Sequence, residues 1–243
     1  MSKKKRTEVV LPNEEELYTP QKKKLPYKVR LKCKNKKQKD YANLIDDEDI
    51  EMVFVKGKAG CGKTYVAVCK ALELLKEREE YEKIYLVTSS IPSEENLGML
   101  PGTVEDKLRP SQMSFLIVID ELIGRSTREK LFEEGRIEYM PISYLRGVNL
   151  RNCIGLGDEL QNLTIRGMKT LLTRISYNAK FVIMGDTDQI DNPKLKKETS
   201  GLNYIIEKVK QHPDNRMGIV EFGEEDVVRN PIINTILNLF GES

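Results

Sequence analysis

The sequence predicts an α/β fold, a parallel β-sheet flanked by helices, organised as a single core domain. From about residue 35 onward, short aliphatic runs typical of buried strands alternate with segments whose apolar residues recur at helical spacing. One such run and one such segment are joined by a glycine-rich loop at residues 57–64, GKAGCGKT. The chain has 243 residues, which is enough to bury one good hydrophobic core.

The first expected elements surround this loop. Residues 35–45 have the spacing of a helix, and residues 52–55 form the short apolar, β-rich run expected of a buried strand. After the loop, residues 64–75 carry apolar side chains on one helical face, and residues 83–88 read as a second strand.

The later elements continue the alternation. A turn is expected at residues 100–102, and a helical stretch capped by Thr103 should then run to about residue 135. Beyond it we expect strands at 137–142, 152–157, 180–185 and 218–222, and helices at 164–175, from about 200, and at 231–240. Strands and helices that alternate in this way form a parallel sheet with helices on both faces.

The glycine-rich loop matches the phosphate-binding pattern G-x-x-x-x-G-K-[ST]. Its glycines let the backbone turn N–H groups toward phosphates, and the helix that follows points its positive end at the same anion. Lys63 should reach the β- and γ-phosphates, and the Thr64 hydroxyl should ligate Mg²⁺. The expected nucleotide contacts are Gly57, Lys58, Ala59, Gly60, Cys61, Gly62, Lys63 and Thr64.

Composition narrows the class of protein. Charged residues make up 32% and hydrophobic residues 39%, as in soluble globular proteins, and the longest aliphatic and aromatic run, 115–119, is too short to span a bilayer. The four cysteines form no C-x-x-C pair, so we expect no zinc site and no disulfide framework, and a reducing cytoplasm fits best. The single histidine, His212, is expected at the surface, which argues against a histidine base.

The net charge of +2 hides an asymmetry. Residues 1–40 hold 14 Lys/Arg and 5 Asp/Glu, whereas the remainder of the chain is acidic. We therefore divide the chain into a basic, largely disordered segment at 1–34 and a folded domain at 35–243. The basic segment either holds nucleic-acid phosphates through counterion release or is a solvated tail, and the sequence favours neither.

Two Asp-Glu pairs compete for the acidic position that a phosphate loop needs beside Mg²⁺. Asp120 and Glu121 follow the strongly apolar run 115–119, but Pro110 stands shortly before it and apolar residues continue after it without a turn. These features predict a buried helix opened by proline rather than a strand.

Asp158 and Glu159 form the second pair. The run before them, 152–157, contains two glycines that weaken it as a strand. Polar residues and a capped helix follow, however, which places the pair at the carboxyl end of a strand, where ligands bind in α/β sheets. We therefore prefer Asp158 and Glu159.

A third segment supports this choice, because the strand expected at 180–185 ends in GDTDQ. The phosphate loop, then DELQ, then GDTDQ resemble in this order the ATPase core of superfamily-one helicases, which implies a P-loop NTPase with a RecA-like core. Further stretches narrow the resemblance to the PhoH-like ATPases over roughly residues 35–240: NKKQ at 35–38, LGMLPG at 97–102, YLRG at 144–147, LTR at 172–174, GDTDQID at 185–191, SGL at 200–202 and DVVR at 226–229.

The chain departs from the family pattern in two places. The family has Thr-Arg-Pro after the second strand, whereas Thr88 is followed by Ser89 and Ser90, so an arginine role there is absent. The strand before the preferred acidic pair is diluted by Gly155 and Gly157. The rest of the constellation is intact, so the resemblance still implies ATPase activity.

Phosphoryl-transfer chemistry and the resemblance together give the expected roles. Lys63 and the loop amides would hold the phosphates, while Thr64 and Asp158 would hold Mg²⁺, Asp158 acting through water. Glu159 would orient and deprotonate the attacking water, and Gln189 would sense the γ-phosphate.

Other roles rest on the resemblance alone. Asp186 would assist in sensing the γ-phosphate, and Gln38 would contact adenine and favour ATP over GTP. Arg229 and Arg174 rank above Arg146 as arginines of the nucleotide site. The alternatives are that Gln38 is an exposed helix residue and that the arginines are surface ion-pair residues.

The expected function is that of an ATP-binding, Mg²⁺-dependent ATPase acting on single-stranded nucleic acid, with RNA favoured. Only 54 residues follow Gln189, too few for the second core domain of a superfamily-one motor, so we expect a homo-oligomer such as a ring, with no membrane partner. One alternative is a nucleotide-switched binding protein without motor activity. Another is a small-molecule kinase, which the hydrolytic motifs disfavour.

Overall fold

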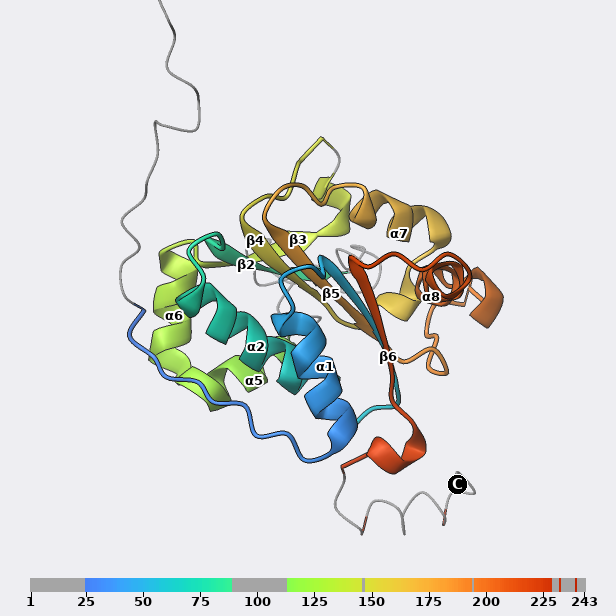
Figure 1. Cartoon of the computed structure of the whole chain (residues 1–243), viewed down its shortest axis with the longest axis horizontal. Coiled ribbons are helices and arrows are strands. Elements are labelled where there is room, and N and C mark those ends of the chain that lie inside the picture. The colour runs from blue at the N-terminus through green and yellow to red at the C-terminus, as the bar shows by residue number, and fades with distance from the viewer. Residues whose placement is uncertain are drawn as a thin grey trace, which may run out of the picture.

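The computed structural model describes residues 25–88, 113–145, 147–193 and 195–228, together with residues 232 and 239. Within these residues, six strands form one parallel sheet in the order β3-β2-β4-β5-β1-β6 (Figure 1). The strands are β1 (Met52–Lys56), β2 (Lys83–Thr88), β3 (Ile137–Pro141), β4 (Cys153–Gly157), β5 (Ala179–Gly185) and β6 (Met217–Glu221). The α/β fold with a parallel sheet is confirmed.

Helices cover both faces of the sheet (Figure 1). One face carries α1 (Lys36–Asp46), α2 (Lys63–Glu77), α5 (Met113–Ile123) and α6 (Arg125–Glu133). The other carries α7 (Ile165–Leu172) and α8 (Gly201–Gln211). Short 3-10 helices lie in the connections: η3 (Ile142–Leu145), η4 (Leu160–Asn162), η5 (Lys197–Thr199) and η6 (Glu224–Asp226).

The described elements begin and end close to where the sequence places them, because local capping signals fix several ends. Asn35 caps α1 by accepting from Gln38 N at 2.8 Å, and Thr164 caps α7 by accepting from Gly167 N at 3.0 Å. In its described part, from residue 113 onward, the helical stretch expected up to residue 135 is divided into α5 and α6. Gly124 separates them with a φ of 78°, which a continuous helix does not accommodate.

Some expectations fall outside the described residues. They are the turn and cap at 100–103, the helix at 231–240, and the side chains of Arg146 and Arg229. Among the described helices, none has the length and apolar character needed to cross a bilayer.

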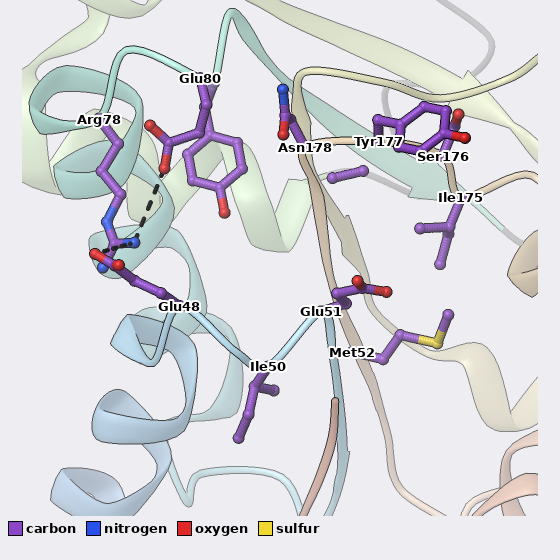
Figure 2. Close-up of a pocket in the computed structure, with 12 residues that line it drawn as sticks. Glu48, Ile50, Glu51, Met52, Arg78, Glu80, Ile175, Ser176, Tyr177 and Asn178 are labelled. Carbon is purple, nitrogen blue, oxygen red and sulfur yellow. Dashed lines mark ion pairs between the residues drawn. The ribbon is translucent and has the colours of Figure 1, made fainter. Parts of the chain in front are cut away.

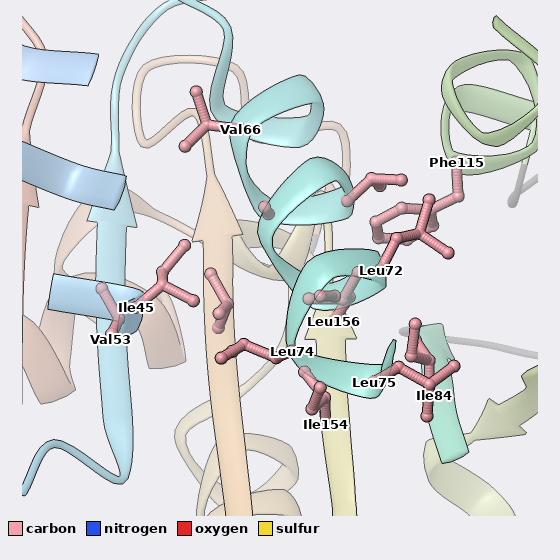
Figure 3. Close-up of a cluster of buried hydrophobic side chains, with 14 of the residues drawn as sticks. Ile45, Val53, Val66, Leu72, Leu74, Leu75, Ile84, Phe115, Ile154 and Leu156 are labelled. Atoms are coloured by element: carbon pink, nitrogen blue, oxygen red, sulfur yellow. The ribbon is translucent and has the colours of Figure 1, made fainter. Parts of the chain in front are cut away.

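Each face of the sheet has its own hydrophobic core. In β1, Val53 and Val55 face the α1–α2 side, whereas Phe54 faces the α7–α8 side, as the alternation of a strand requires. On the first side, Leu72 and Leu75 of α2 belong to the same cluster as Ile84 and Phe115 (Figure 3). The central strands β4 and β5 are buried along their whole length, which explains their nearly continuous apolar character.

The two glycines of β4 leave room for neighbouring side chains. A Cβ at Gly155 would stand 2.1 Å from the ring of Phe181, and one at Gly157 would stand 2.4 Å from Leu160. The strand sits between β2 and β5, where its neighbours hold it on both sides. Its low strand propensity is therefore outweighed by packing that only glycine permits.

Residues 25–34 belong to the folded unit. Leu25 and Tyr27 are buried in the core on the α2 side, and the Tyr27 hydroxyl donates to Leu72 O at 2.9 Å. Lys76 Nζ donates to the carbonyl oxygen of Tyr27. This segment runs past α6 and α2 to the start of α1 (Figure 1), so the folded unit already includes Leu25, ten residues before the expected boundary.

The strand order brings three loops together. Because β5 lies between β1 and β4, the segments that follow β1, β5 and β4 emerge side by side at the edge where the carboxyl ends of the parallel strands meet, here called the carboxyl edge. Lys56 pairs with Gly185, and Gly157 pairs with Ile183. The opposite edge, here called the amino edge, carries the starts of the same strands.

Candidate nucleotide-binding site

The phosphate loop leaves β1 at the carboxyl edge and leads directly into α2. Gly60 and Gly62 have φ values of 89° and 87°, which L side chains rarely adopt. Gly57 lies against Phe222, since a Cβ added at Gly57 would stand 2.6 Å from the Phe222 Cβ. The loop therefore needs two of its glycines for conformation and the third for space.

Lys63 stands in the first turn of α2 with only 8% of its surface exposed. Its Nζ donates to Gly57 O at 2.6 Å and to Lys58 O at 3.1 Å. A phosphate oxygen is a stronger acceptor than these carbonyls because it is charged. The ammonium group is thus held where a phosphate in the loop would attract it.

Asp158 follows β4 and meets the phosphate loop directly. The Thr64 Oγ1 donates to Asp158 Oδ2 at 2.7 Å, and the Ser114 Oγ of α5 lies 3.5 Å from the same oxygen. Hydroxyl and carboxylate oxygens are ligands that Mg²⁺ accepts. Among the residues that the structure describes, no group of three or more His, Cys, Asp and Glu side chains could hold a metal ion.

The competing pair lies elsewhere. Asp120 is in α5, as the proline and the continuous apolar run predict, and it accepts from Arg128 Nε at 2.5 Å and from Arg128 Nη2 at 3.3 Å. Asp120 is therefore engaged in an ion pair between α5 and α6. The carboxylate that contacts Thr64 is that of Asp158.

Glu159 has an unusual backbone. Its φ is 55°, in the left-handed region that a non-glycine residue seldom adopts, and such strain concentrates at functional sites. Its side chain accepts a hydrogen bond from Gln161 Nε2 at 2.7 Å on Oε2. Partial desolvation raises the pKa of the Glu159 carboxyl, the hydrogen bond from Gln161 opposes this rise, and the negative charge of Asp158 adds to it.

The segment after β5 lies between the loops that follow β1 and β4. Asp186 is 4% exposed, and its Oδ1 accepts from Asp188 N at 3.1 Å. Its other oxygen, Oδ2, is buried and has no hydrogen-bond partner among the described residues. Gln189 N donates to Asp186 O at 3.1 Å, while the Gln189 residue itself is exposed.

Gln38 is buried against the phosphate loop. Its Nε2 donates to Cys61 O at 3.0 Å, and its Oε1 accepts from Lys34 N at 2.7 Å. A Cβ at Gly62 would stand 2.7 Å from the same Nε2, so Gly62 is also needed for this contact. The side chain supports the loop, and its contact with adenine stays a prediction.

A family model described as "PhoH-like protein" matches residues 30–241. The chain belongs to the PhoH-like family. This confirms the resemblance drawn from the motifs.

Relatives support the same assignment. The chain is 35% identical over 210 residues to the PhoH-like protein of Bacillus subtilis, which covers 86% of this chain and 64% of the relative. It is 32% identical over 210 residues to the protein PhoH of Escherichia coli, which covers 86% of this chain and 57% of the relative. This PhoH-like chain therefore spans about three fifths of the length of these two relatives.

Solved structures give a more distant likeness. The large terminase of a thermophilic bacteriophage, solved with ADP, has a TM-score of 0.49 and 10% identity, covering 84% of this chain and 49% of the terminase. The Pif1 helicase of Candida albicans has a TM-score of 0.41 and 13% identity, covering 86% of this chain and 44% of the helicase.

Sequence reasoning missed several residues of the site in this PhoH-like chain. Gln161 was part of the DELQ motif but had no role, although its side chain contacts Glu159. The sequence predicts Arg229 of the DVVR segment as a nucleotide-site arginine but no other contact after β6, yet Val228 N donates to Gly60 O at 3.0 Å and Lys58 Nζ pairs with Glu224 at 2.5 Å. These contacts join segments more than 160 residues apart, so no local signal could reveal them.

Of the candidate arginines, only Arg174 lies among the residues that the structure describes. Arg174 follows α7. Its carbonyl oxygen accepts a hydrogen bond from Leu150 N at 2.8 Å, and this bond places Arg174 beside residues of the amino edge. The length of β1, roughly 13 Å at about 3.3 Å per residue, separates this edge from the phosphate loop. Arg174 therefore does not reach the loop of its own chain, and Arg146 and Arg229 lie outside the described residues.

A hollow of about 820 Å³ lies at the amino edge, away from the phosphate loop (Figure 2). One side is formed by the ends of α1 and α2 and the other by the segment before β5, with Tyr177 exposed on it. Arg78 pairs there with Glu48 at 3.0 Å and lies 3.9 Å from Glu80. The hollow contains none of the predicted nucleotide contacts.

Proposed function

We propose that this PhoH-like chain is a Mg²⁺-dependent ATPase that acts as a homo-oligomer on single-stranded nucleic acid, with RNA favoured. The observation that carries the ATPase proposal is the 2.7 Å contact between Thr64 of the phosphate loop and Asp158 after β4. It brings together the two oxygens that P-loop NTPases use for Mg²⁺, and Glu159 follows immediately in the chain. The P-loop NTPase fold itself implies nucleotide binding.

The residues of the site support a hydrolytic mechanism. Lys63 would exchange its loop carbonyls for the β- and γ-phosphates, since a charged acceptor binds an ammonium group more strongly. Thr64 and Asp158 would hold Mg²⁺, which when bound neutralises charge on the phosphates. Glu159 would take a proton from the attacking water, and the raised pKa of its carboxyl makes it a better base.

The segment after β5 supplies further groups. Asp186 Oδ2 is buried without a partner among the described residues, so it can accept a hydrogen bond from water or another donor that enters the site. Gln189 follows in the same segment, and its exposed side chain would sense the γ-phosphate. Gln38 would contact adenine and favour ATP over GTP.

Hydrolysis of ATP by purified protein, with Mg²⁺ and with excess chelator, tests the proposal. We expect Lys63→Ala to abolish tight ATP binding and Asp158→Asn to abolish Mg²⁺-dependent turnover. Asp120→Asn is the matched control, because Asp120 pairs with Arg128 and should leave the rate unchanged. Activity that survives Asp158→Asn and is lost in Asp120→Asn would reverse the assignment.

The nucleic-acid part of the proposal is tested separately. ATP hydrolysis should rise when single-stranded RNA is added at low salt and rise less at moderate salt, because phosphate contacts weaken as salt increases. Equal rates with and without RNA, together with ATP-dependent binding of a protein partner, would favour the nucleotide-switched binding protein instead.

A further inference from the structure

Gln161 is the most completely enclosed polar side chain of the nucleotide site. The residue has 0% of its surface exposed, and it lies in η4, the short helix that begins immediately after Asp158 and Glu159. A buried amide is costly unless its donors and acceptor are satisfied. The contacts of Gln161 therefore have to be specific.

Those contacts reach two functional segments, the one after β4 and the one after β5. Nε2 donates to Glu159 Oε2 at 2.7 Å and to the carbonyl oxygen of Gln189 at 2.9 Å. Oε1 accepts from Asp186 N at 3.1 Å. Both amide hydrogens and the amide oxygen are used, so the side chain has a single orientation that satisfies all of them.

The backbone around Gln161 is fixed as well. The buried Ser200 Oγ donates to Gln161 O at 2.9 Å, and Gly201 N donates to Leu163 O at 2.7 Å. These two bonds attach η4 to the start of α8. A Cβ at Gly185 would stand 2.4 Å from Gln161 Oε1, so glycine is needed at the end of β5 for the amide to fit.

We propose that Gln161 is a positioning residue for the attacking group of the ATPase, an inference that rests on the function proposed above. It occupies Oε2 of Glu159 and leaves Oε1 to accept the proton of the attacking water. Glu159 has several side-chain torsions and stands on a strained backbone with φ 55°, so without the amide its carboxylate would sample other directions. The same amide holds the Asp186–Gln189 segment at a fixed distance from this carboxylate.

Because Gln161 is neutral, it orients Glu159 without neutralising it. A cation in the same place would stabilise the carboxylate and make it a weaker base. The bonds to Gln189 O and Asp186 N satisfy one hydrogen and the oxygen of the amide, and the remaining hydrogen is the one that binds the Glu159 side chain.

The test compares Gln161→Leu with Ser200→Ala. Leucine has a volume similar to that of glutamine, and Gln161→Leu removes all three side-chain hydrogen bonds. Ser200→Ala removes the buried hydrogen bond to the backbone oxygen of Gln161 and leaves the Gln161 side chain in place. We expect Gln161→Leu to lower kcat by about 10- to 100-fold, as a misplaced catalytic group does, with the Kd for ATP within about twofold of wild type. Ser200→Ala should lower the melting temperature but keep kcat within about twofold.

A double-mutant cycle separates positioning from structure. If Gln161 acts through Glu159, then Gln161→Leu should have little further effect on single-turnover hydrolysis in a Glu159→Gln background. A full additional loss in that background would overturn the inference, and so would a wild-type kcat in Gln161→Leu. If the wild-type protein hydrolyses no ATP with Mg²⁺ and RNA, both the proposed function and this inference fail, whereas an active wild type with an active Gln161→Leu refutes only the inference.

Discussion

The two edges of the sheet use charge in opposite ways. At the amino edge, charged groups satisfy one another or cap backbone carbonyls, as Arg78 does with Glu48 and as the buried Lys180 does with the oxygens of Asp47 and Ile50. At the carboxyl edge, polar groups of three loops are held close together, and Asp186 keeps a buried oxygen without a partner among the described residues.

This difference follows from the direction of parallel strands. The carboxyl ends of β1, β4 and β5 open into loops whose backbone N–H groups and side chains can converge on a ligand. The amino ends receive the carboxyl ends of helices, whose last carbonyls need donors, and Lys180 supplies one for α1. The carboxyl edge thus gathers polar groups from three loops, whereas the charged groups of the amino edge are paired within the fold.

The prediction with the largest expected effect is that the amino edge of one copy contacts the carboxyl edge of another in an oligomer. If a neighbouring copy closes the nucleotide site with an arginine, Arg174→Ala or Arg229→Ala should lower turnover by about 10³–10⁵ with little change in ATP affinity. The specific rate should also rise with protein concentration until the oligomer forms. Dependence on Arg174 would mean that the amino edge of one copy serves the carboxyl edge of the next.

Complementation provides the control for this prediction. Mixing Lys63→Ala with the inactive arginine variant should restore part of the activity, because mixed oligomers contain interfaces with an intact loop and an intact arginine. A monomer by light scattering with a concentration-independent specific rate, and no recovery on mixing, would contradict it.

The next effect concerns the base at the carboxyl edge. Glu159→Gln should keep ATP bound and slow hydrolysis by about 10²–10⁴, the contribution of a positioned general base. Glu121→Gln is the matched control on the exposed side of α5 and should retain wild-type turnover. Single-turnover hydrolysis and nucleotide binding, measured on both variants, check this, and loss of turnover only in Glu121→Gln would refute the site.

The next prediction concerns a smaller effect, the pH dependence that Lys180 of the amino edge gives to the stability of the fold. Burial lowers the pKa of Lys180 from 10.5 to about 8, with the positive charge of Arg78 adding to this effect. Between these values the unfolded chain binds more protons than the folded one, so the contribution of Lys180 to stability should rise as the pH rises from 8 toward 10.5.

Urea unfolding of wild type and Lys180→Met at pH 7.5 and pH 10 measures this. Wild type should gain about 2 kcal/mol relative to the variant across this range. Buried thiols such as Cys153, whose pKa burial raises to about 12, act in the opposite direction but are shared by both proteins. Equal pH dependence of the two proteins would show that Lys180 titrates normally.

The smallest effect concerns the basic segment. Deleting residues 1–24 removes seven Lys/Arg and four Glu but no buried side chain of the described core. It should leave basal ATPase activity intact, weaken RNA binding and flatten its salt dependence. If the deletion leaves the salt dependence of RNA binding unchanged, the segment contributes to solubility and not to RNA binding.

Deletion through residue 34 should behave differently. It removes Leu25 and Tyr27, and burying each such side chain contributes about 1.5–3 kcal/mol, so the melting temperature should fall. Equal melting temperatures for the two deletions would mean that residues 25–34 contribute little to the fold.

The sequence by itself determined the fold class, most strand and helix positions and the phosphate loop. These features depend on local periodicity, on capping residues such as Asn35, and on glycines in the left-handed region of φ. Each of these signals can be recognised in a short stretch of sequence. The preference for Asp158 over Asp120 also came from local signals, the proline before one run and the polar residues after the other.

Tertiary structure decided what no short stretch contains. Gly155 and Gly157 look unfavourable in a strand until Phe181 and Leu160 are seen to fill their space. The role inferred for Gln161 depends on β4 and β5 lying side by side, because that pairing brings Glu159 and Asp186 to the same amide. Non-local packing and hydrogen bonding fix such contacts, and these depend on which loops the sheet places side by side.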